Sequence, residues 1–328
     1  MLDLFGLGNA IVDTEVNVND AFLTEQEVGK GLMNLVDDDR MASLLTALTG
    51  HETSQCGGGS AANTTYAVQA FGLQTAYTFR VAKDAVGHFF VDSMKSAGVR
   101  VSDHAMHDHG HSGQCLVLIT PDAERSMNTN LGISAELQPA DVNFELLEQS
   151  RYFYVEGYMS SVESGTAAAV ACREHAEKAG VPVSISLSDP AMVEFCRGGL
   201  EAMLGNGVDS VFCNEEEALA WTRTDRLDIA MNELKDLAKE VYVTVGAAGS
   251  IVISAAGQQQ ADGYPTQAID TTGAGDMYAG ATLAARLSGA DPIDAARFAN
   301  HCASTIVAQY GARLGQPDEY RLLRERFE

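Results

Sequence analysis

The residues best suited to chemistry lie in one glycine-rich stretch, residues 270–276 (DTTGAGD). The stretch ends an apparent strand and opens an apolar, Gly/Ala-rich helix predicted over residues 273–287. Small residues leave the N–H groups of the first helical turn unobstructed, and these donors with the positive helix end form a site for developing negative charge. Asp276 lies in the same turn, where its carboxylate could take a proton from an attacking hydroxyl group. The alternative is that Asp276 only complements the helix dipole.

A second glycine-rich stretch, residues 57–63 (GGGSAAN), precedes a helix predicted over residues 60–71. It has no Lys-Ser/Thr ending and is therefore not a P-loop. Three glycines before a helix allow a ligand to lie against backbone N–H groups, and the amide of Asn63 can both donate and accept. The other interpretation is an ordinary tight turn. A third candidate, residues 6–8 (GLG), lacks the glycine that a dinucleotide fingerprint would need where Ile11 stands.

Short apolar runs alternate with helical patterns along most of the chain, which predicts a largely parallel sheet with helices on both faces. The predicted strands are residues 4–12, 75–79, 152–155, 183–186, 210–213 and 241–245. The predicted helices are residues 60–71, 84–97, 164–179, 192–204, 215–221, 229–239, 273–287 and 291–310.

Two polar segments interrupt this pattern, residues 14–37 and 100–131. We interpret them as β-rich excursions that form a small lid over one edge of the sheet. The α/β core then consists of residues 1–13, 38–99 and 132–328.

Composition excludes several classes of protein. The 328 residues contain 21 Lys+Arg and 45 Asp+Glu, a formal net charge of −24. This acidic balance argues against binding nucleic acid or an anionic lipid surface, because both need a basic footprint. No apolar run approaches the ~18 residues of a membrane span. Residues 1–11 lack the basic start of a secretory signal, so a cytoplasmic protein is expected.

The spacing of the cysteines and histidines bears on disulfides and metal sites. The six cysteines are scattered without a CxxC pair, so we expect reduced thiols rather than disulfides or a zinc site. The cluster His104, His107, His109 and His111 has spacing that could bind a metal ion. The other interpretation is a solvated lid loop, since no second type of ligand completes a site.

Residues 58–63 together with residues 270–276 resemble the two signature regions of the PfkB (ribokinase-like) carbohydrate kinases, and the resemblance extends over nearly the whole chain. Residues 214–217 (NEEE) look like the Asn-x-x-Glu motif of that family. Within the family, residues 8–13 (GNAIVD), 124–131 (ERSMNTNL) and 186–190 (SLSDP) look like stretches of adenosine kinases, closest to a bacterial group. The resemblance implies a ribokinase-like three-layer α/β/α sandwich with a mostly parallel central sheet and a small β lid.

The resemblance also implies roles for single residues. Asp276 would be the base that deprotonates the acceptor hydroxyl, and Gly273, Ala274 and Gly275 would form the anion hole around the transferred phosphoryl group. The acceptor would be held by Asn9, Asp13, Gly58, Gly59, Asn63, Glu156 and Arg125, with Asp13 on the 2′- and 3′-hydroxyls of a ribose. ATP would be held by Asn214, Glu217, Thr244, Gly246 and Asn300. Glu217 would also serve Mg²⁺ through water, and Asp270 and Thr272, beside residues 311–312, are candidates for a monovalent cation such as K⁺.

One departure from the family pattern concerns the acceptor. Glu156 is not what vertebrate adenosine kinases carry at that place, and it is closer to sugar kinases and to a bacterial adenosine kinase-like group. It keeps a plain sugar acceptor open, although a strand-end carboxylate facing solvent is the other interpretation. The residues that contact a purine cannot be assigned by motif. The candidates, each of which could instead be lid or core packing, are Phe22, Met33, Leu35, Met127, Leu131 and Tyr158.

The resemblance therefore implies a phosphotransferase with an alcohol acceptor that converts ATP and adenosine to ADP and AMP, an enzyme of purine salvage. The alternative acceptors are another nucleoside (inosine or guanosine) or a sugar such as ribose or fructose. A non-catalytic nucleotide sensor is a third hypothesis. Such proteins usually lose the base or the anion-hole glycines, whereas Gly273, Gly275 and Asp276 are all present here. The expected partner is a small-molecule substrate, and the protein would be a monomer or a homodimer.

Overall fold

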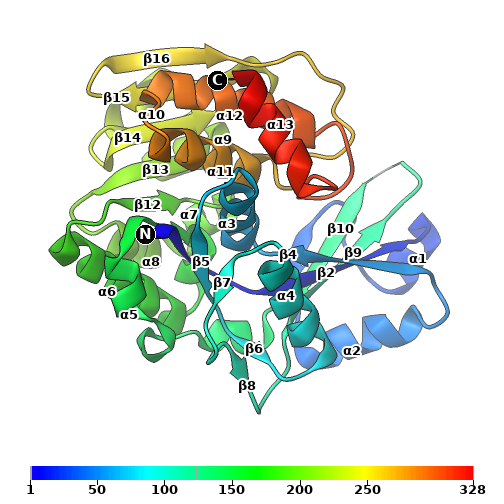
Figure 1. Ribbon diagram of the computed structural model, residues 1–328. Helices are drawn as coiled ribbons and strands as arrows, with labels where there is room; N and C mark the ends of the chain where they lie inside the picture. Colours follow the sequence, from blue (N-terminus) through cyan, green and yellow to red (C-terminus); the bar gives the residue numbers. More distant parts are fainter. Residues whose placement is uncertain (1, 123, 328) are drawn as a thin grey trace.

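The computed structural model describes residues 2–122 and 124–327, and a nine-stranded sheet forms the centre of this part of the chain (Figure 1). Neighbouring strands from β14 to β7 are parallel, whereas β14, β15 and β16 pair antiparallel. In spatial order the strands are β16 (Gly257–Asp262), β15 (Gly249–Ser254), β14 (Ala238–Thr244), β13 (Val208–Asn214), β12 (Val183–Ser186), β11 (Ser150–Glu156), β1 (Leu2–Leu7), β5 (Thr75–Thr78) and β7 (Arg100–Val101). We call it the large sheet.

Helices cover both faces of the large sheet, because its strands are apolar on both sides. On β11, Phe153 and Val155 belong to one apolar cluster and Tyr154 to the other, as the two-residue period of a strand requires. The Tyr154 face packs against α3 (Ser60–Ala70), α4 (Ala85–Ser96), α11 (Ala274–Leu287), α12 (Pro292–Ile306) and α13 (Pro317–Phe327). The opposite face packs against α5 (Phe144–Glu148), α6 (Glu163–Ala179), α7 (Pro190–Phe195), α8 (Arg197–Leu204), α9 (Glu215–Thr222) and α10 (Leu227–Leu234). The predicted sandwich with a mostly parallel central sheet is confirmed.

A second sheet, which we call the small sheet, projects from one side of the large one (right in Figure 1). Its strands in spatial order are β3 (Met33–Leu35), β10 (Arg125–Asn130), β9 (Gly113–Ile119), β2 (Ile11–Asn17) and β4 (Thr53–Gly58). Two helices, α1 (Asp20–Glu25) and α2 (Asp38–Ala47), cover its outer face through an apolar cluster that contains Leu44, Leu116 and Leu118. The inner face is turned toward the candidate site.

The small sheet includes elements outside the ranges 14–37 and 100–131. β4 lies within residues 38–99 but pairs with β2 over its whole length. Its polar sequence, TSQCGG, shows no alternation of apolar residues because β4 is a largely exposed edge strand. Conversely, residues 100–101 form β7 at the edge of the large sheet, and a short pair of strands, β6 (Val81–Ala82) and β8 (Met106–His107), lies nearby. The division into a core and a moving lid stays a prediction.

The predicted strand over residues 4–12 is two strands, because the chain turns at residues 8–10 to pass from the large sheet to the small one. A Cβ on Gly8 would lie 2.8 Å from the carboxyl carbon of Glu156, so this turn requires glycine. The predicted helix over residues 229–239 ends at Leu234, and the chain enters β14 at Ala238. Short 3₁₀ helices connect other elements at Gly132–Glu136, Pro139–Asp141, Gly157–Ser161 and Gly246–Ala248.

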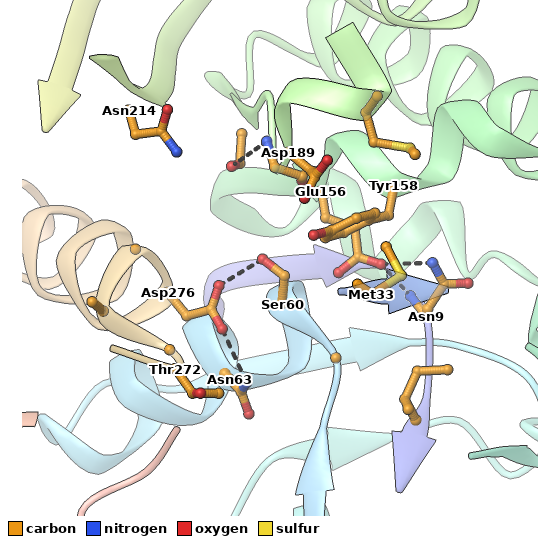
Figure 2. Close-up of a pocket in the computed structure, with 18 of the residues that line it drawn as sticks. Asn9, Met33, Ser60, Asn63, Glu156, Tyr158, Asp189, Asn214, Thr272 and Asp276 are labelled. Atoms are coloured by element: carbon orange, nitrogen blue, oxygen red, sulfur yellow. Dashed lines mark hydrogen bonds between the residues drawn. The ribbon is translucent and has the colours of Figure 1, made fainter. Parts of the chain in front are cut away.

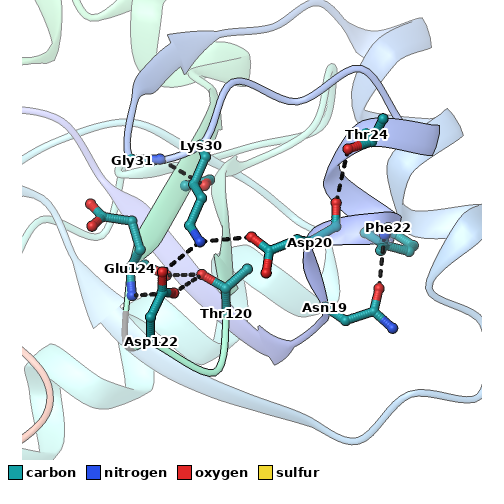
Figure 3. Close-up of polar contacts among 10 residues, drawn as sticks. Asn19, Asp20, Phe22, Thr24, Lys30, Gly31, Thr120, Asp122 and Glu124 are labelled. Carbon is teal, nitrogen blue, oxygen red and sulfur yellow. Dashed lines mark hydrogen bonds and ion pairs between the residues drawn. The ribbon is translucent and has the colours of Figure 1, made fainter.

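Lys30 joins two segments at the outer end of the small sheet (Figure 3). Its Nζ lies 2.7 Å from Asp20 Oδ1 on α1 and 2.6 Å from Asp122 Oδ2 in the turn between β9 and β10. Thr120 Oγ1 donates to the other oxygen of Asp122 at 2.6 Å. Because these groups are exposed, the ion pairs orient the turn more than they stabilise the protein.

The cysteines and histidines have simple surroundings. All six cysteines are free thiols. His107, His109 and His111 each lie beside a carboxylate, at Asp141, Glu136 and Asp38 respectively. Within residues 2–122 and 124–327, no group of three or more His, Cys, Asp or Glu side chains could hold a metal ion. None of the helices described above is both long and apolar enough to cross a membrane.

The packing of α2 on the small sheet can be tested at Leu44, which is fully buried there. Leu44→Ala should lower the free energy of unfolding by about 2–4 kcal/mol, because it leaves a cavity between the helix and the sheet. Denaturant titration measures this loss, and hydrogen exchange should accelerate at the amides of β9 and β10. The neighbouring Leu45 is 39% exposed, and Leu45→Ala should change stability by less than about 0.5 kcal/mol. Unchanged exchange in Leu44→Ala would show that α2 does not hold the small sheet.

Candidate active site

A cavity of about 490 Å³ lies between the carboxyl ends of the large-sheet strands and the inner face of the small sheet. Four strands end in residues that line it: Glu156 on β11, Ser186 on β12, Asn214 on β13 and Thr244 on β14. Ligands of open α/β sheets bind at this edge because the strand ends and helix starts meet there. The lining includes many of the predicted residues, namely Asn9, Asp13, Gly59, Asn63, Glu156, Asn214, Glu217, Thr244, Thr272, Gly273, Ala274, Gly275 and Asp276. It does not include Gly58, Arg125, Gly246, Asp270 or Asn300.

Asp276 lies at the start of α11 and faces the start of α3 (Figure 2). Ser60 Oγ donates to Asp276 Oδ1 at 2.6 Å, and Asn63 Nδ2 donates to Oδ2 at 3.0 Å. Burial raises the pKa of Asp276 to about 6, although these two hydrogen bonds act in the opposite direction. A carboxylate that is held on both oxygens, faces a cavity and titrates near neutral pH is suited to act as a general base.

The first turn of α11 offers free hydrogen-bond donors beside Asp276. Gly273 begins the helix with φ +74°, and its Cβ would lie 2.6 Å from Ala312 Cα, so only glycine fits between the helix and residues 311–312. The N–H group of Ala274 donates to Thr271 O at 3.2 Å. In the described part of the chain, the N–H groups of Gly273, Gly275 and Asp276 have no acceptor. These three groups, rather than that of Ala274, are therefore free to bind an anion.

Asp13 presents a carboxylate that makes no hydrogen bond or ion pair within the described residues. It lies on the inner face of β2, and burial raises its pKa to about 7 against the lowering effect of the charges on Arg125 and Arg313. A Cβ on Gly58 would lie 2.6 Å from both Asp13 oxygens, so the glycine makes room for this carboxylate. Gly59 has φ +90°, and a Cβ there would lie 2.6 Å from Asn9 O. Gly58 and Gly59 thus shape the wall around Asp13, and the acceptor capacity of Asp13 is left for a ligand.

Glu156 is almost completely buried and binds the protein itself. Its Oε1 accepts from the backbone N and from Nδ2 of Asn9, both at 2.8 Å, and its Oε2 accepts from Ala61 N at 2.6 Å. Burial nevertheless raises its pKa to about 7. Ser134 Oγ donates to Asn9 Oδ1 at 3.1 Å, so both ends of the Asn9 amide are also engaged. The strand-end carboxylate therefore does not face solvent, and it holds Asn9 and the start of α3 in place.

Asn214 and Glu217 bind each other at the start of α9. Asn214 Oδ1 accepts from Glu217 N at 2.8 Å, while Asn214 Nδ2 donates to Glu217 Oε1 at 2.7 Å. This is a capping box, in which two otherwise unpaired N–H groups are satisfied reciprocally. Burial raises the pKa of Glu217 to about 7.

Arg125 and Asp270 connect the small sheet to the loop before α11. Arg125 Nη1 lies 2.7 Å from Asp270 Oδ2, and Arg125 Nη2 lies 2.6 Å from Glu15 Oε1. Asp270 also accepts from Thr272 N and Oγ1 and from Gly311 N. Burial disfavours the charged form of Asp270, but these hydrogen bonds and the charge of Arg125 outweigh it and hold its pKa below the usual range. With four hydrogen bonds on the carboxylate, Asp270 does not fit a monovalent cation unless Arg125 moves away.

Two residues expected at ATP lie elsewhere. Asn300 is buried on α12, and its Nδ2 donates to Ala261 O and Asp262 O, which ties the helix to β16. Gly246 has φ +60° and open space where a Cβ would stand. The other three residues expected at ATP, Asn214, Glu217 and Thr244, line the cavity.

An apolar wall closes the cavity on the side of the small sheet. It consists of Ile11, Met33, Leu35, Cys115, Met127 and Leu131. Tyr158 lines the cavity from the side of the large sheet, and Figure 2 shows it beside Met33. Phe22, another candidate for a purine contact, instead packs against the cluster on the outer face of the small sheet.

Comparisons with known proteins identify the family of this chain. The model of the pfkB family carbohydrate kinases matches residues 32–319. The chain belongs to the pfkB family. It is 29% identical to an adenosine kinase of Saccharomyces cerevisiae, over 87% of this chain and 88% of that protein. The crystal structure of an adenosine kinase from Sinorhizobium meliloti superposes with a TM-score of 0.90 and 33% identity, covering 99% of each chain. A probable sugar kinase from Rhizobium etli superposes with a TM-score of 0.91 and 30% identity, covering 99% of this chain and 98% of that chain.

Membership of the pfkB family makes the protein a phosphotransferase that acts on a sugar or a nucleoside, and the family implies use of ATP, typically with Mg²⁺. The cavity fits Mg²⁺ bound mainly through phosphates and water, because Mg²⁺ usually takes only one or two carboxylates from the protein. Each oxygen of Glu217 accepts one hydrogen bond from Asn214 and keeps one lone pair toward its surroundings. Glu217 could therefore hold a water molecule of the Mg²⁺ shell.

The motifs did not reveal two residues that contact the predicted site. Ser60 stands inside the second glycine-rich stretch but had no assigned role, although it donates to Asp276. Arg313 reaches the site from the loop after α12, and its Nε donates to Asn63 Oδ1 at 2.9 Å. Ser60 could have been found as the first residue of a helix facing Asp276, whereas no local pattern marks Arg313.

The shielded carboxylates of the cavity should make stability depend on pH. Burial raises the pKa of Asp13 and of Glu156 to about 7, so between about pH 4 and 7 the folded protein binds more protons than the unfolded chain. The stability that these groups contribute is therefore full below pH 4 and is lost as the pH rises through 7. Calorimetry of the ligand-free protein should show the Tm falling between pH 5.5 and 8.

Asp13→Asn should flatten that slope and raise the Tm at pH 8 by roughly 2–4 °C, since it removes one buried charge. The exposed Asp39 supplies the matched control, and Asp39→Asn should keep the wild-type slope. A slope that is equally steep in both variants would contradict the assignment of the pH dependence to the cavity.

Proposed function

We propose that this protein transfers the γ-phosphoryl group of ATP to the 5′-hydroxyl group of adenosine, giving AMP and ADP. One observation carries the proposal: a single cavity combines the Asp276 site with the unpaired Asp13 carboxylate and an apolar wall. A carboxylate can accept hydrogen bonds from the 2′- and 3′-hydroxyls of ribose. The apolar wall suits the faces of a purine base, which a free sugar lacks. The similarity to two adenosine kinases supports adenine as that base.

In this proposal Asp276 takes the proton of the 5′-hydroxyl as that oxygen attacks the γ-phosphorus atom. Ser60 and Asn63 hold the carboxylate so that one lone pair points toward the acceptor. The free N–H groups of Gly273, Gly275 and Asp276 bind the oxygens of the transferred phosphoryl group, where negative charge must be stabilised in the transition state. Mg²⁺, when bound, would neutralise charge on the phosphates.

The remaining residues would align the two substrates. Asp13 holds the ribose, and Glu156 acts indirectly by fixing Asn9 at the nucleoside side of the cavity. Asn214, Glu217 and Thr244, which line the cavity, would face the phosphates and their Mg²⁺. Arg125 would exchange Asp270 for a phosphate if the small sheet closes further. Such alignment is the main contribution that a protein makes to phosphoryl transfer.

The role of Asp276 can be tested by Asp276→Asn, which keeps the shape of the side chain but removes the base. The variant should lose roughly 10²–10⁴-fold in kcat while adenosine still binds. A coupled ADP-release assay measures kcat, and calorimetry measures the Kd of adenosine. In the wild type, kcat/KM should rise with pH between about 6 and 7 and then level, following deprotonation of Asp276 and of Asp13. Near wild-type kcat in the variant would show that Asp276 is not the base.

The acceptor can be tested by the same assay with adenosine, inosine, guanosine, ribose and fructose. We expect adenosine to have the highest kcat/KM, and only nucleosides to raise the Tm strongly, because a ligand that binds only the folded state stabilises it. A higher kcat/KM for ribose or fructose than for adenosine would show that the acceptor is a sugar. The apolar wall would then serve only to pack the small sheet.

A further inference from the structure

Arg313 places a partly buried positive charge next to Asn63, on the acceptor side of the cavity. Its guanidinium carbon lies 4.5 Å above the ring of Tyr66, and its Nη1 donates to Ser93 Oγ at 3.3 Å. No carboxylate of the described residues forms an ion pair with it. Buried charges are normally paired because desolvating them is costly. A salt bridge therefore does not explain why an arginine occupies this position.

The hydrogen bond to Asn63 supplies that explanation. Arginine only donates hydrogen bonds, so Arg313 Nε must face the oxygen of the Asn63 amide, at 2.9 Å. The opposite end of the amide, Nδ2, then faces Asp276 Oδ2 at 3.0 Å. With the amide reversed, its oxygen would face the Asp276 carboxylate and its NH₂ group would face the guanidinium, and both contacts would be repulsive.

The backbone makes room for this arrangement at Gly57. A Cβ on Gly57 would lie 2.9 Å from Arg313 Nη1 and 3.1 Å from Nη2. A side chain at the first glycine of the GGG stretch would thus displace the Arg313 guanidinium, as one at the second would displace the Asp13 carboxylate. Arg313 therefore packs against the end of β4, which forms part of the acceptor side of the cavity.

We propose that Arg313 is a positioning residue, which holds the Asn63 amide in the one orientation that presents Nδ2 to Asp276 and so aims that carboxylate at the acceptor hydroxyl. The inference rests on the proposed function, because it takes Asp276 as the base. Arg313 is not a catalytic residue, since Asn63 stands between it and Asp276.

The charge of Arg313 has a second effect that can be measured separately. It lowers the pKa of Asp276 and of Asp13, against the burial that raises both. Other titratable groups that feel or face the charge of Arg313 are Tyr66 on α3, Tyr77 on β5, Tyr320 on α13 and Cys56 on β4. Removal of the charge should therefore raise the pKa of Asp276, and the acid limb of kcat/KM should move to higher pH.

Two substitutions separate orientation from charge. Arg313→Gln keeps an N–H donor at the same number of bonds from the backbone as Nε, but it has no charge. Arg313→Met has a similar length and neither donor nor charge. Arg313→Met should lower kcat by roughly 10–100-fold, as expected for a misaligned base, with a smaller change in KM for the acceptor. Arg313→Gln should recover most of that loss, whereas both variants should shift the acid limb upward by roughly 0.5–1 unit.

A double-mutant cycle tests whether Arg313 acts through Asn63. If it does, adding Arg313→Met to Asn63→Ala should cost little further kcat, because the relay is already broken. The proposal would be overturned if the fold-losses in kcat of the two single variants multiplied in the double variant. It would also be overturned if Arg313→Gln were as slow as Arg313→Met. Arg173→Met is the matched control, since Arg173 is a buried arginine that pairs with Glu177 on α6 instead of contacting Asn63. It should affect stability and leave the pH profile unchanged.

Carboxyl ¹³C NMR of Asp276 in the ligand-free protein gives a readout that needs no turnover. The pKa of Asp276 should rise in Arg313→Met and Arg313→Gln and stay at the wild-type value in Arg173→Met. If no acceptor is phosphorylated, the proposed function fails, yet this titration still tests the charge of Arg313. An unchanged titration together with unchanged kcat in Arg313→Met would overturn the inference even if the proposed function holds.

Discussion

The close contact between α3 and α11 places the reactive groups together. A Cβ on Gly280 would lie 2.8 Å from Ala67 Cβ and 3.0 Å from Thr64 O, so the two helices touch nearly backbone to backbone. This approach brings Ser60 within hydrogen-bond distance of Asp276, although the two residues are 216 positions apart in the chain. Both helices start at glycine-rich stretches, so two helix N-termini open on the same cavity. A bulkier residue at Gly280 would separate the helices and leave Asp276 without its two donors.

The cavity gathers negative charge in a chain that already carries a formal charge of −24. Asp13, Glu156, Glu217 and Asp276 are all partly or fully shielded from solvent, and burial raises the pKa of each to about 6 or 7. Folding these groups together costs stability at neutral pH. The positive end of α11 and the guanidinium of Arg313 offset part of that cost, and both act at the side where the proposed reaction takes place.

The small sheet contributes differently from the large one. Its inner face supplies Asp13 and the apolar wall, and Arg125 ties it to the loop before α11 through Asp270. Strand ends and helix starts of the large sheet supply the groups proposed for phosphoryl transfer. Acceptor binding and chemistry thus come from two sheets that meet at one cavity. The Arg125–Asp270 ion pair connects them.

Much of this molecule can be predicted from the amino-acid sequence. Local patterns determine the alternation of strands and helices, and the two glycine-rich stretches mark the helix starts because only small residues leave their N–H groups open. The edge strands β4 and β16 escaped prediction, since exposed strands need no apolar alternation. Tertiary structure alone decided that Glu156 binds Asn9 and Ala61 instead of offering a free carboxylate to a ligand. It also decided that Arg313 contacts Asn63 across 250 residues, because no local pattern encodes which distant side chains meet when the helices pack.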